Sequence, residues 1–204
     1  MHKFTRGESP VDLARLKRNY SNWESIAHSN EHAQLGDALY ERQERYCAYC
    51  ETQIESKRKG HIEHLERRSD TPARTFDWSN MFFSCNHHDS CGKFKDEFQP
   101  RMNFDPADII DPSQEDPLDF FLYDLNGGIS ARDEAHKTRA DETIRIFNLD
   151  QSPRLSNIRR GVAETVKSML PYLNSEEDVT DFLNSLGNCD CISVYYSLLG
   201  RKMV

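Results

Sequence analysis

Four cysteines constrain the fold of this chain more than any other feature of its sequence. Cys47 and Cys50 are separated by two residues, and Cys85 and Cys91 by five, which gives the pattern C-x2-C-x34-C-x5-C. A C-x2-C turn can direct both thiolates at one ion, and four thiolates satisfy tetrahedral Zn²⁺ with no open position. The pattern therefore predicts a structural zinc site that ties residue 47 to residue 91, with His87 or His88 as an alternative to one thiolate.

The cellular compartment bears on this prediction. The N-terminal sequence MHKFTRGESP lacks the apolar stretch of a secretion signal. No apolar run approaches the roughly 20 residues of a membrane span. We therefore expect a cytoplasmic protein with no membrane partner, in which cysteines are more often metal ligands or free thiols than disulfides. Cys189 and Cys191 form a C-x-C pair without nearby partners and are expected to be ordinary thiols.

The charge of the chain is unevenly distributed. Residues 104–134 contain nine acidic residues and one base, Arg132, and so account for the whole net charge of −8. Residues 56–74 contain six bases against three acids. A basic stretch near an acidic segment is compatible with a polyanionic substrate, although an ordinary solvated surface would look the same.

Helix signals lie on both sides of the cysteine-rich segment. Ser9 followed by Pro10 predicts the start of a first helix, and a second is expected over 30–45. Ser152 followed by Pro153 and Ser175 followed by Asp178 predict two further helices, the first of which ends at Pro171. The sequence Asn126-Gly127-Gly128 predicts a hairpin turn, because these residues tolerate positive φ.

The segment between the cysteine pairs carries residues suited to phosphodiester chemistry. Glu63 and His64 place a carboxylate beside an imidazole, and Asn80 follows shortly before Cys85. A neutral histidine, with an ordinary pKa of about 6.5, can take a proton from an attacking water. Glu63 and Asn80 are oxygen donors of the kind that Mg²⁺ accepts, and such an ion can neutralise the phosphate.

The order of these motifs resembles that of the HNH nucleases, whose core is a two-strand ribbon and a helix (ββα-metal). The segments that carry the resemblance are CAYC, HIEHL, DWSNMFFSC and CGKFK. The resemblance implies that His64 is the general base and that Glu63 is a ligand of a catalytic Mg²⁺ or Mn²⁺. Asn80 would orient the loop that carries the base or ligate the ion, and Cys91 and Lys95 would belong to the closing helix.

One position departs from the family pattern. Many relatives carry a last histidine directly after the second cysteine pair, where this chain has Gly92. The third metal position is therefore open between His87, His88 and Asn80. We favour Glu63 with Asn80 and keep His88 as the alternative. His61, two residues before Glu63, would share its face of a strand.

Longer strings are similar to one subfamily, the PtuB effectors of Septu-type and retron-associated antiphage systems. They are KFTRGESPVDL, Trp23, YCAYCE, IIDP and ETIRIFNLD. This similarity implies an endonuclease in bacterial antiviral defence that works with a PtuA-type ATPase, and a retron reverse transcriptase with its msDNA is a further candidate partner. DNA is the favoured substrate, with RNA or tRNA as the alternative.

The expected fold is therefore α+β, with a zinc-stapled ββα-metal (HNH) core between N-terminal helices and a mostly helical C-terminal region. The expected domains are 1–45, an N-terminal helical region; 46–100, the nuclease core with its zinc knuckle; and 101–204, the acidic connector, hairpin and helices. The C-terminal helices would serve as a docking surface or only cover the core. The rival hypothesis for the whole chain is a non-enzymatic zinc module that binds nucleic acid or protein as an adaptor.

Overall fold

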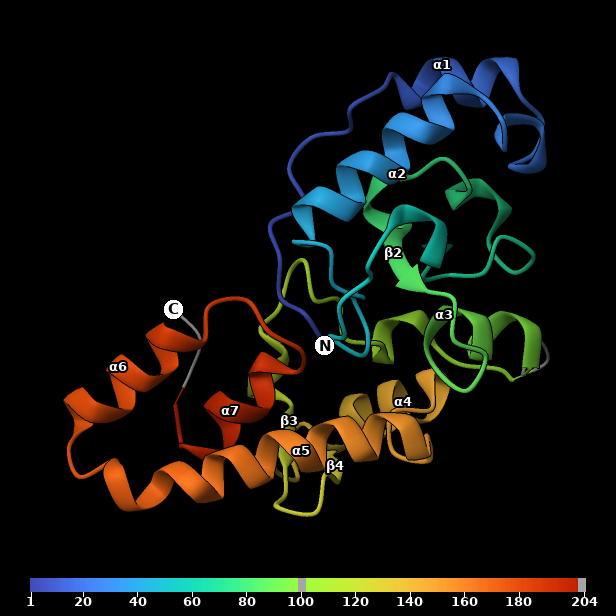
Figure 1. Cartoon of the computed structure of the whole chain (residues 1–204). Helices are drawn as coiled ribbons and strands as arrows, with labels where there is room; N and C mark the ends of the chain where they lie inside the picture. Colours follow the sequence, from blue (N-terminus) through green and yellow to red (C-terminus); the bar gives the residue numbers. More distant parts are fainter. Residues whose placement is uncertain (99–101, 202–204) are drawn as a thin grey trace.

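A pair of short antiparallel strands lies between an N-terminal and a C-terminal group of helices (Figure 1). The computed structural model describes residues 1–98 and 102–201. Within them the chain forms α1 (Leu13–Asn19), α2 (Asn30–Arg42), β1 (Gly60–His64), β2 (Met81–Cys85), α3 (Cys91–Lys93), β3 (Phe121–Tyr123), β4 (Ile129–Ala131), α4 (Lys137–Phe147), α5 (Pro153–Met169), α6 (Glu176–Leu186) and α7 (Ile192–Leu198). Single helical turns connect them: η1 (Glu24–Ile26), η2 (Lys57–Lys59), η3 (Pro72–Arg74), η4 (Trp78–Asn80), η5 (Phe94–Phe98), η6 (Pro106–Asp108), η7 (Pro117–Asp119) and η8 (Leu170–Tyr172). The expected α+β class is confirmed.

The central strands are positioned by burial on both sides. β1 and β2 pair in register from Gly60 opposite Cys85 to His64 opposite Met81. Every residue of β2 is buried, and α2 packs across both strands. Gly36 of α2 faces Ile62 of β1, at a distance where a methyl group would make an ordinary van der Waals contact. β2 leads to α3, so the polypeptide order is strand, strand, helix.

Helix starts follow local capping chemistry. Ser152 and Ser175 cap α5 and α6 as predicted, and Ser175 with Asp178 forms a reciprocal capping box. The prediction for the first helix was wrong, because α1 begins at Leu13. Ser9 instead bonds locally to Val11, and the side chain of Asp12 accepts the amide of Arg15 as the cap.

The C-terminal part is helical around a small hairpin. β3 and β4 pair on either side of the Asn126–Gly128 turn, as predicted. Gly127 has φ +83° and its backbone lies against α5, so a side chain there would meet Ser156 and Arg160. α5 packs on α7, and α7 packs on β3.

The N-terminal residues return to the middle of the molecule. The amide of His2 bonds to the carbonyl of Ala48, and that of Phe4 to Pro112. Arg6 is buried, with its guanidinium 4.3 Å from the ring centroid of Phe82. Buried side chains from all three expected domains thus meet in one apolar cluster. The domain boundaries at residues 45 and 100 stay a prediction.

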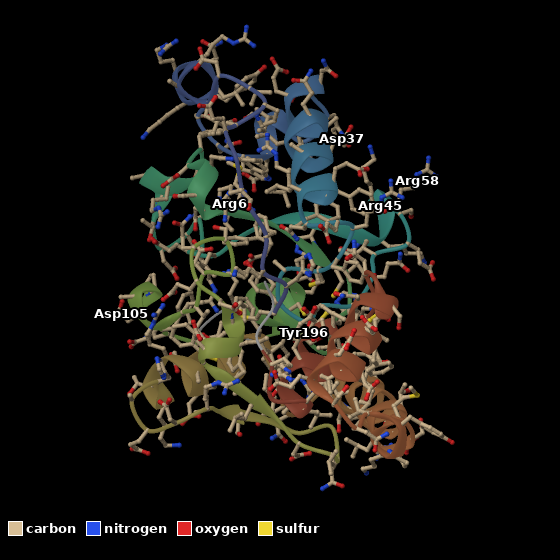
Figure 2. The ribbon with its side chains drawn as sticks, turned by 90° about the vertical axis from the view of Figure 1, so that its left-hand side faces the viewer. Arg6, Asp37, Arg45, Arg58, Asp105 and Tyr196 are labelled. Atoms are coloured by element: carbon tan, nitrogen blue, oxygen red, sulfur yellow. The ribbon has the colours of Figure 1, made fainter. Side chains whose placement is uncertain are left out.

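The basic stretch and the acidic segment lie apart in the fold. In Figure 2 Arg45 and Arg58 lie on one side, and Asp105 of the acidic segment lies on the other. In the described residues no helix combines the length and apolarity that crossing a bilayer requires.

Candidate zinc centre and nuclease site

The four cysteines converge on one point. Their Sγ atoms all lie within 4.8 Å of one another, and all four residues are buried. Tetrahedral zinc with Zn–S bonds of about 2.3 Å places its sulfurs about 3.8 Å apart. The Sγ atoms of Cys50 and Cys85 are 3.8 Å apart. The donor set therefore fits a structural zinc ion, as the spacing predicted.

Neighbouring groups suit a cluster of thiolates. The amide of Cys85 points at Sγ of Cys47 at 3.4 Å, and Thr52 Oγ1 lies 3.1 Å from Sγ of Cys50. Hydrogen bonds from the other thiols lower the pKa of Cys50, whereas burial raises that of Cys91. The thiol pKa values thus shift in opposite directions within one cluster. A bound divalent cation would favour the thiolate form of all four cysteines. Four thiolates around Zn²⁺ leave two negative charges, and the positive charge of Arg154 lies close enough to interact with Cys50 and Cys91.

His87 and His88, the alternative zinc ligands, lie outside the cysteine cluster. Among the described residues the cluster consists of the four cysteines, so neither His87 nor His88 replaces a thiolate. Both histidines are exposed, and His88 Nδ1 lies 3.3 Å from Glu97. Cys191 is buried outside the cluster, and its Sγ points at the carbonyl of Cys50.

His64 ends β1 and is held in a defined orientation. Its Nε2 lies 2.9 Å from the carbonyl oxygen of Thr75, and its ring meets Trp23 edge to face with centroids 4.6 Å apart. Only 3% of the residue is exposed. Burial lowers the pKa of His64 to about 3, so the imidazole is neutral.

Asn80 holds the loop that orients His64. Its Oδ1 accepts the amide of Glu66 at 2.8 Å, and its Nδ2 donates to the carbonyls of Glu66 at 3.0 Å and Arg74 at 3.3 Å. Asn80 is 1% exposed, so these bonds are shielded from water. The carboxamide thereby fixes the loop between Glu66 and Thr75.

Glu63 points to the other face of β1 and has a cation as its partner. Lys95 Nζ lies 2.6 Å from Glu63 Oε1, 2.6 Å from the carbonyl of His64 and 3.0 Å from Asp96. Tyr49 donates its hydroxyl to the other oxygen of Glu63. The Glu63 and Lys95 side chains are fully buried, and burial raises the pKa of Glu63 while the Lys95 charge opposes that rise.

Gly92 stands where many HNH nucleases carry the last metal-binding histidine, and the structure leaves no space there for a side chain. A Cβ at Gly92 would overlap the side chain of Glu63 and lie 3.1 Å from His61 Nε2. His61 and Glu63 do share a face, as expected for alternate strand residues. The side chains of Glu63 and Asn80, however, share no hydrogen-bond partner among the described residues. Around Glu63 the described residues thus fit no divalent ion in this conformation, because the ammonium of Lys95 already neutralises the carboxylate. The ligand roles of Glu63 and Asn80 stay a prediction.

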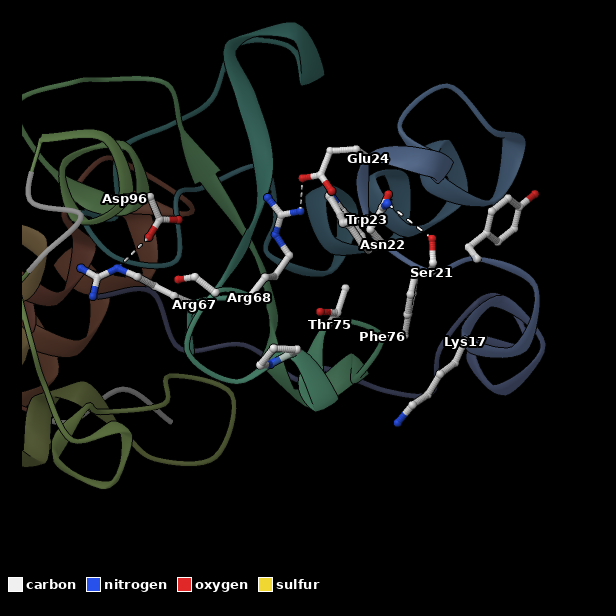
Figure 3. Close-up of a pocket in the computed structure, with 13 residues that line it drawn as sticks. Lys17, Ser21, Asn22, Trp23, Glu24, Arg67, Arg68, Thr75, Phe76 and Asp96 are labelled. Atoms are coloured by element: carbon white, nitrogen blue, oxygen red, sulfur yellow. Dashed lines mark hydrogen bonds and ion pairs between the residues drawn. The ribbon is translucent and has the colours of Figure 1, made fainter.

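A pocket of about 690 Å³ lies next to residues that contact His64, although His64 itself is not among its lining residues. Trp23 and Thr75, the two contacts of His64, both line it, together with Tyr20 and Phe76 (Figure 3). Its cationic lining residues are Lys17, Arg67 and Arg68. Aromatic faces interleaved with basic groups form the kind of surface on which nucleic acids bind.

Sequence patterns did not identify the contacts that orient the site. Thr75 acts through its main-chain carbonyl, so its side-chain type carries no signal. Lys95 lies in the CGKFK motif, but its pairing with Glu63 depends on how η5, which follows α3, packs against β1. Trp23 lies far from His64 in the sequence, and only the fold brings the two rings together.

We compared the chain with known proteins. A scan against protein-family models gave no match, and a search of the curated proteins gave none either. The functional assignment therefore depends on the motifs and on the geometry described above.

Proposed function

We propose that this protein is an endonuclease of the HNH type, which hydrolyses nucleic-acid phosphodiester bonds with His64 as the general base. The observation that carries the proposal is the hydrogen bond from His64 Nε2 to the carbonyl of Thr75. A carbonyl only accepts, so Nε2 holds the proton and Nδ1 keeps the lone pair that a base requires. A histidine held by a carbonyl close to a pocket that three cations and two acids line suits water activation.

The reaction follows from these groups. A water in the pocket would give its proton to Nδ1 of His64 while its oxygen bonds to phosphorus and the bond to the leaving oxygen breaks. The base works best with a pKa near the working pH. An anionic phosphate beside the ring favours the protonated imidazole and would raise the pKa of His64 from its low value. Nearby cations would offset the charge that develops on the phosphate.

The zinc ion has a separate role in this proposal. Four thiolates leave it no open position, so it would supply cross-linking between the turn at Cys47 and the start of α3. That cross-link supports both strands of the ribbon, because Cys85 ends β2 opposite Gly60 of β1.

Two finer features of the proposal come from the motif resemblance. The first is a requirement for Mg²⁺ or Mn²⁺, through which we derive no step because Glu63 is already paired with Lys95. The second is a role as the effector of a bacterial antiphage system with a PtuA-type ATPase. Titration with each metal, with and without such an ATPase, tests both features.

The rival function is a non-enzymatic zinc adaptor. The closed position at Gly92 and the burial of His64 favour it. A cleavage assay on duplex DNA, single-stranded DNA and RNA separates the two. The nuclease proposal predicts new ends on at least one substrate, whereas an adaptor would bind and release every substrate intact.

A further inference from the structure

One exposed ion pair spans the pocket near His64. Arg68 Nη1 lies 2.6 Å from Glu24 Oε1, with side chains 37% and 70% exposed. Arg68 belongs to the loop after β1 and Glu24 begins η1, so the pair connects the N-terminal helical region to the loop that orients His64 (Figure 3). Both residues line the pocket with Trp23 and Thr75.

The other pocket cations bond to main-chain carbonyls. Arg67 is 6% exposed and donates to the main-chain carbonyls of Lys95 at 2.8 Å and Met102 at 2.7 Å. Lys17 is exposed and approaches the carbonyl of Ala73 at 3.3 Å. Arg68 differs from the buried Arg67 because its own side chain is exposed and its partner is an exposed carboxylate, which a solvent anion can replace.

A guanidinium forms the same two-pronged hydrogen bonds with a phosphate as with a carboxylate. Exposed ion pairs contribute little to the free energy of folding, so replacing the carboxylate partner by a phosphate costs little free energy. Arg68 and Glu24 line the same pocket as Trp23 and Thr75, which contact the ring of His64. The pair therefore lies where a phosphate next to the base would lie.

We propose that Arg68 binds a backbone phosphate of the nucleic acid next to His64, and that the carboxylate of Glu24 holds this position in the free protein. The inference rests on the proposed nuclease function and identifies the phosphate-binding residue of that site. Phosphate entry displaces Glu24 from Arg68, and the adjacent aromatic rings of Tyr20 and Phe76 can stack on a nucleotide base.

A double-mutant cycle on oligonucleotide binding tests the proposal. Fluorescence anisotropy of a short labelled oligonucleotide, single-stranded or duplex, is measured at low salt in a His64→Gln background that prevents cleavage. Glu24→Gln should tighten binding about three- to tenfold, and Arg68→Gln should weaken it by a similar factor. In the Arg68→Gln background, Glu24→Gln should have no effect, because its target is gone.

Glu31→Gln is the matched control. It makes the same charge change, on α2 outside the pocket, and removes an exposed ion pair with Arg15 of 2.9 Å. A second readout uses the chain with His64 intact, in which Glu24→Gln should lower KM. Zinc content and circular dichroism identify any variant that misfolds, and Arg68→Lys, which keeps the charge, should bind with intermediate affinity.

The outcomes separate this inference from the nuclease proposal. Equal effects of Glu24→Gln and Glu31→Gln, or an effect of Glu24→Gln that persists without Arg68, would overturn the inference while His64-dependent cleavage could still be observed. Absence of oligonucleotide binding by every variant would contradict both proposals.

Discussion

The imidazole Nε2 of His64 lies 2.9 Å from the carbonyl oxygen of Thr75, and Asn80 anchors the loop that supplies this carbonyl. The bond fixes one neutral tautomer and leaves Nδ1 as the basic nitrogen. Because Trp23 packs against the same ring, the orientation of His64 depends on two segments far from it in sequence. These contacts lead to the following predictions.

Burial of His64 should make stability depend on pH. Its pKa is lowered to about 3 in the folded chain, against about 6.5 when unfolded. Below pH 6.5 the unfolded chain takes up the proton and the folded chain does not, so stability falls as the pH falls toward 3. Between pH 7 and pH 5 the loss should be about 2 kcal/mol.

Urea unfolding of the wild type and of His64→Gln at both pH values checks this contribution. Burial also lowers the pKa of His32 and His61. The difference between the two proteins isolates His64, and the variant should lose less stability on acidification. Identical losses would show that His64 titrates normally in the folded protein.

The four-cysteine cluster should bind one zinc ion per chain and be required for folding. Structural zinc sites contribute roughly 10–16 kcal/mol of binding free energy, so Cys50→Ser should lose the ion and unfold residues 46–98. Elemental analysis and circular dichroism measure both effects. Cys191→Ser is the matched control, because Cys191 is buried outside the cluster and its replacement should keep full zinc content.

Breaking the buried ion pair of Glu63 and Lys95 should lower the free energy of unfolding substantially. Lys95→Met leaves a buried carboxylate without its cation and should destabilise the protein by about 3–5 kcal/mol. The double variant Glu63→Gln/Lys95→Met should cost less than the sum of the single variants, as measured by chemical denaturation. Lys93→Met, which breaks an exposed pair with Glu97, should cost about 0–1 kcal/mol. Equal costs at Lys93 and Lys95 would contradict the assignment.

Asn80 should protect the loop between Glu66 and Thr75 from solvent. Asn80→Ala removes the acceptor of the Glu66 amide and should cost about 1–3 kcal/mol. Hydrogen exchange should accelerate in residues 66–75 while zinc content stays unchanged. Unchanged exchange in this loop would mean that other contacts hold it.

Local chemistry explains which features could be predicted from the sequence. The caps at Ser152 and Ser175, the hairpin turn and the cysteine cluster all depend on residues close in sequence or on strict ligand spacing. Ser9 misled the helix prediction because a serine can equally bond two residues ahead in a turn, as it does with Val11.

The environment of the site could not be predicted in the same way. Glu63 was expected to ligate an ion, but its partner in the fold is Lys95, brought to it by the closing helix. The rings around His64 and the carbonyl of Thr75 are tertiary contacts, which motif spacing does not encode.

Cleavage by His64→Ala tests the central claim most directly. Wild type and variant, with matched zinc content, are incubated with DNA and RNA in the presence of Mg²⁺ or Mn²⁺, and with the exposed His87→Ala variant as control. We predict that the wild type and His87→Ala cut the same substrate and that His64→Ala loses about 100-fold or more of the rate. Cutting by His64→Ala at the wild-type rate would contradict the assignment of His64 as the base.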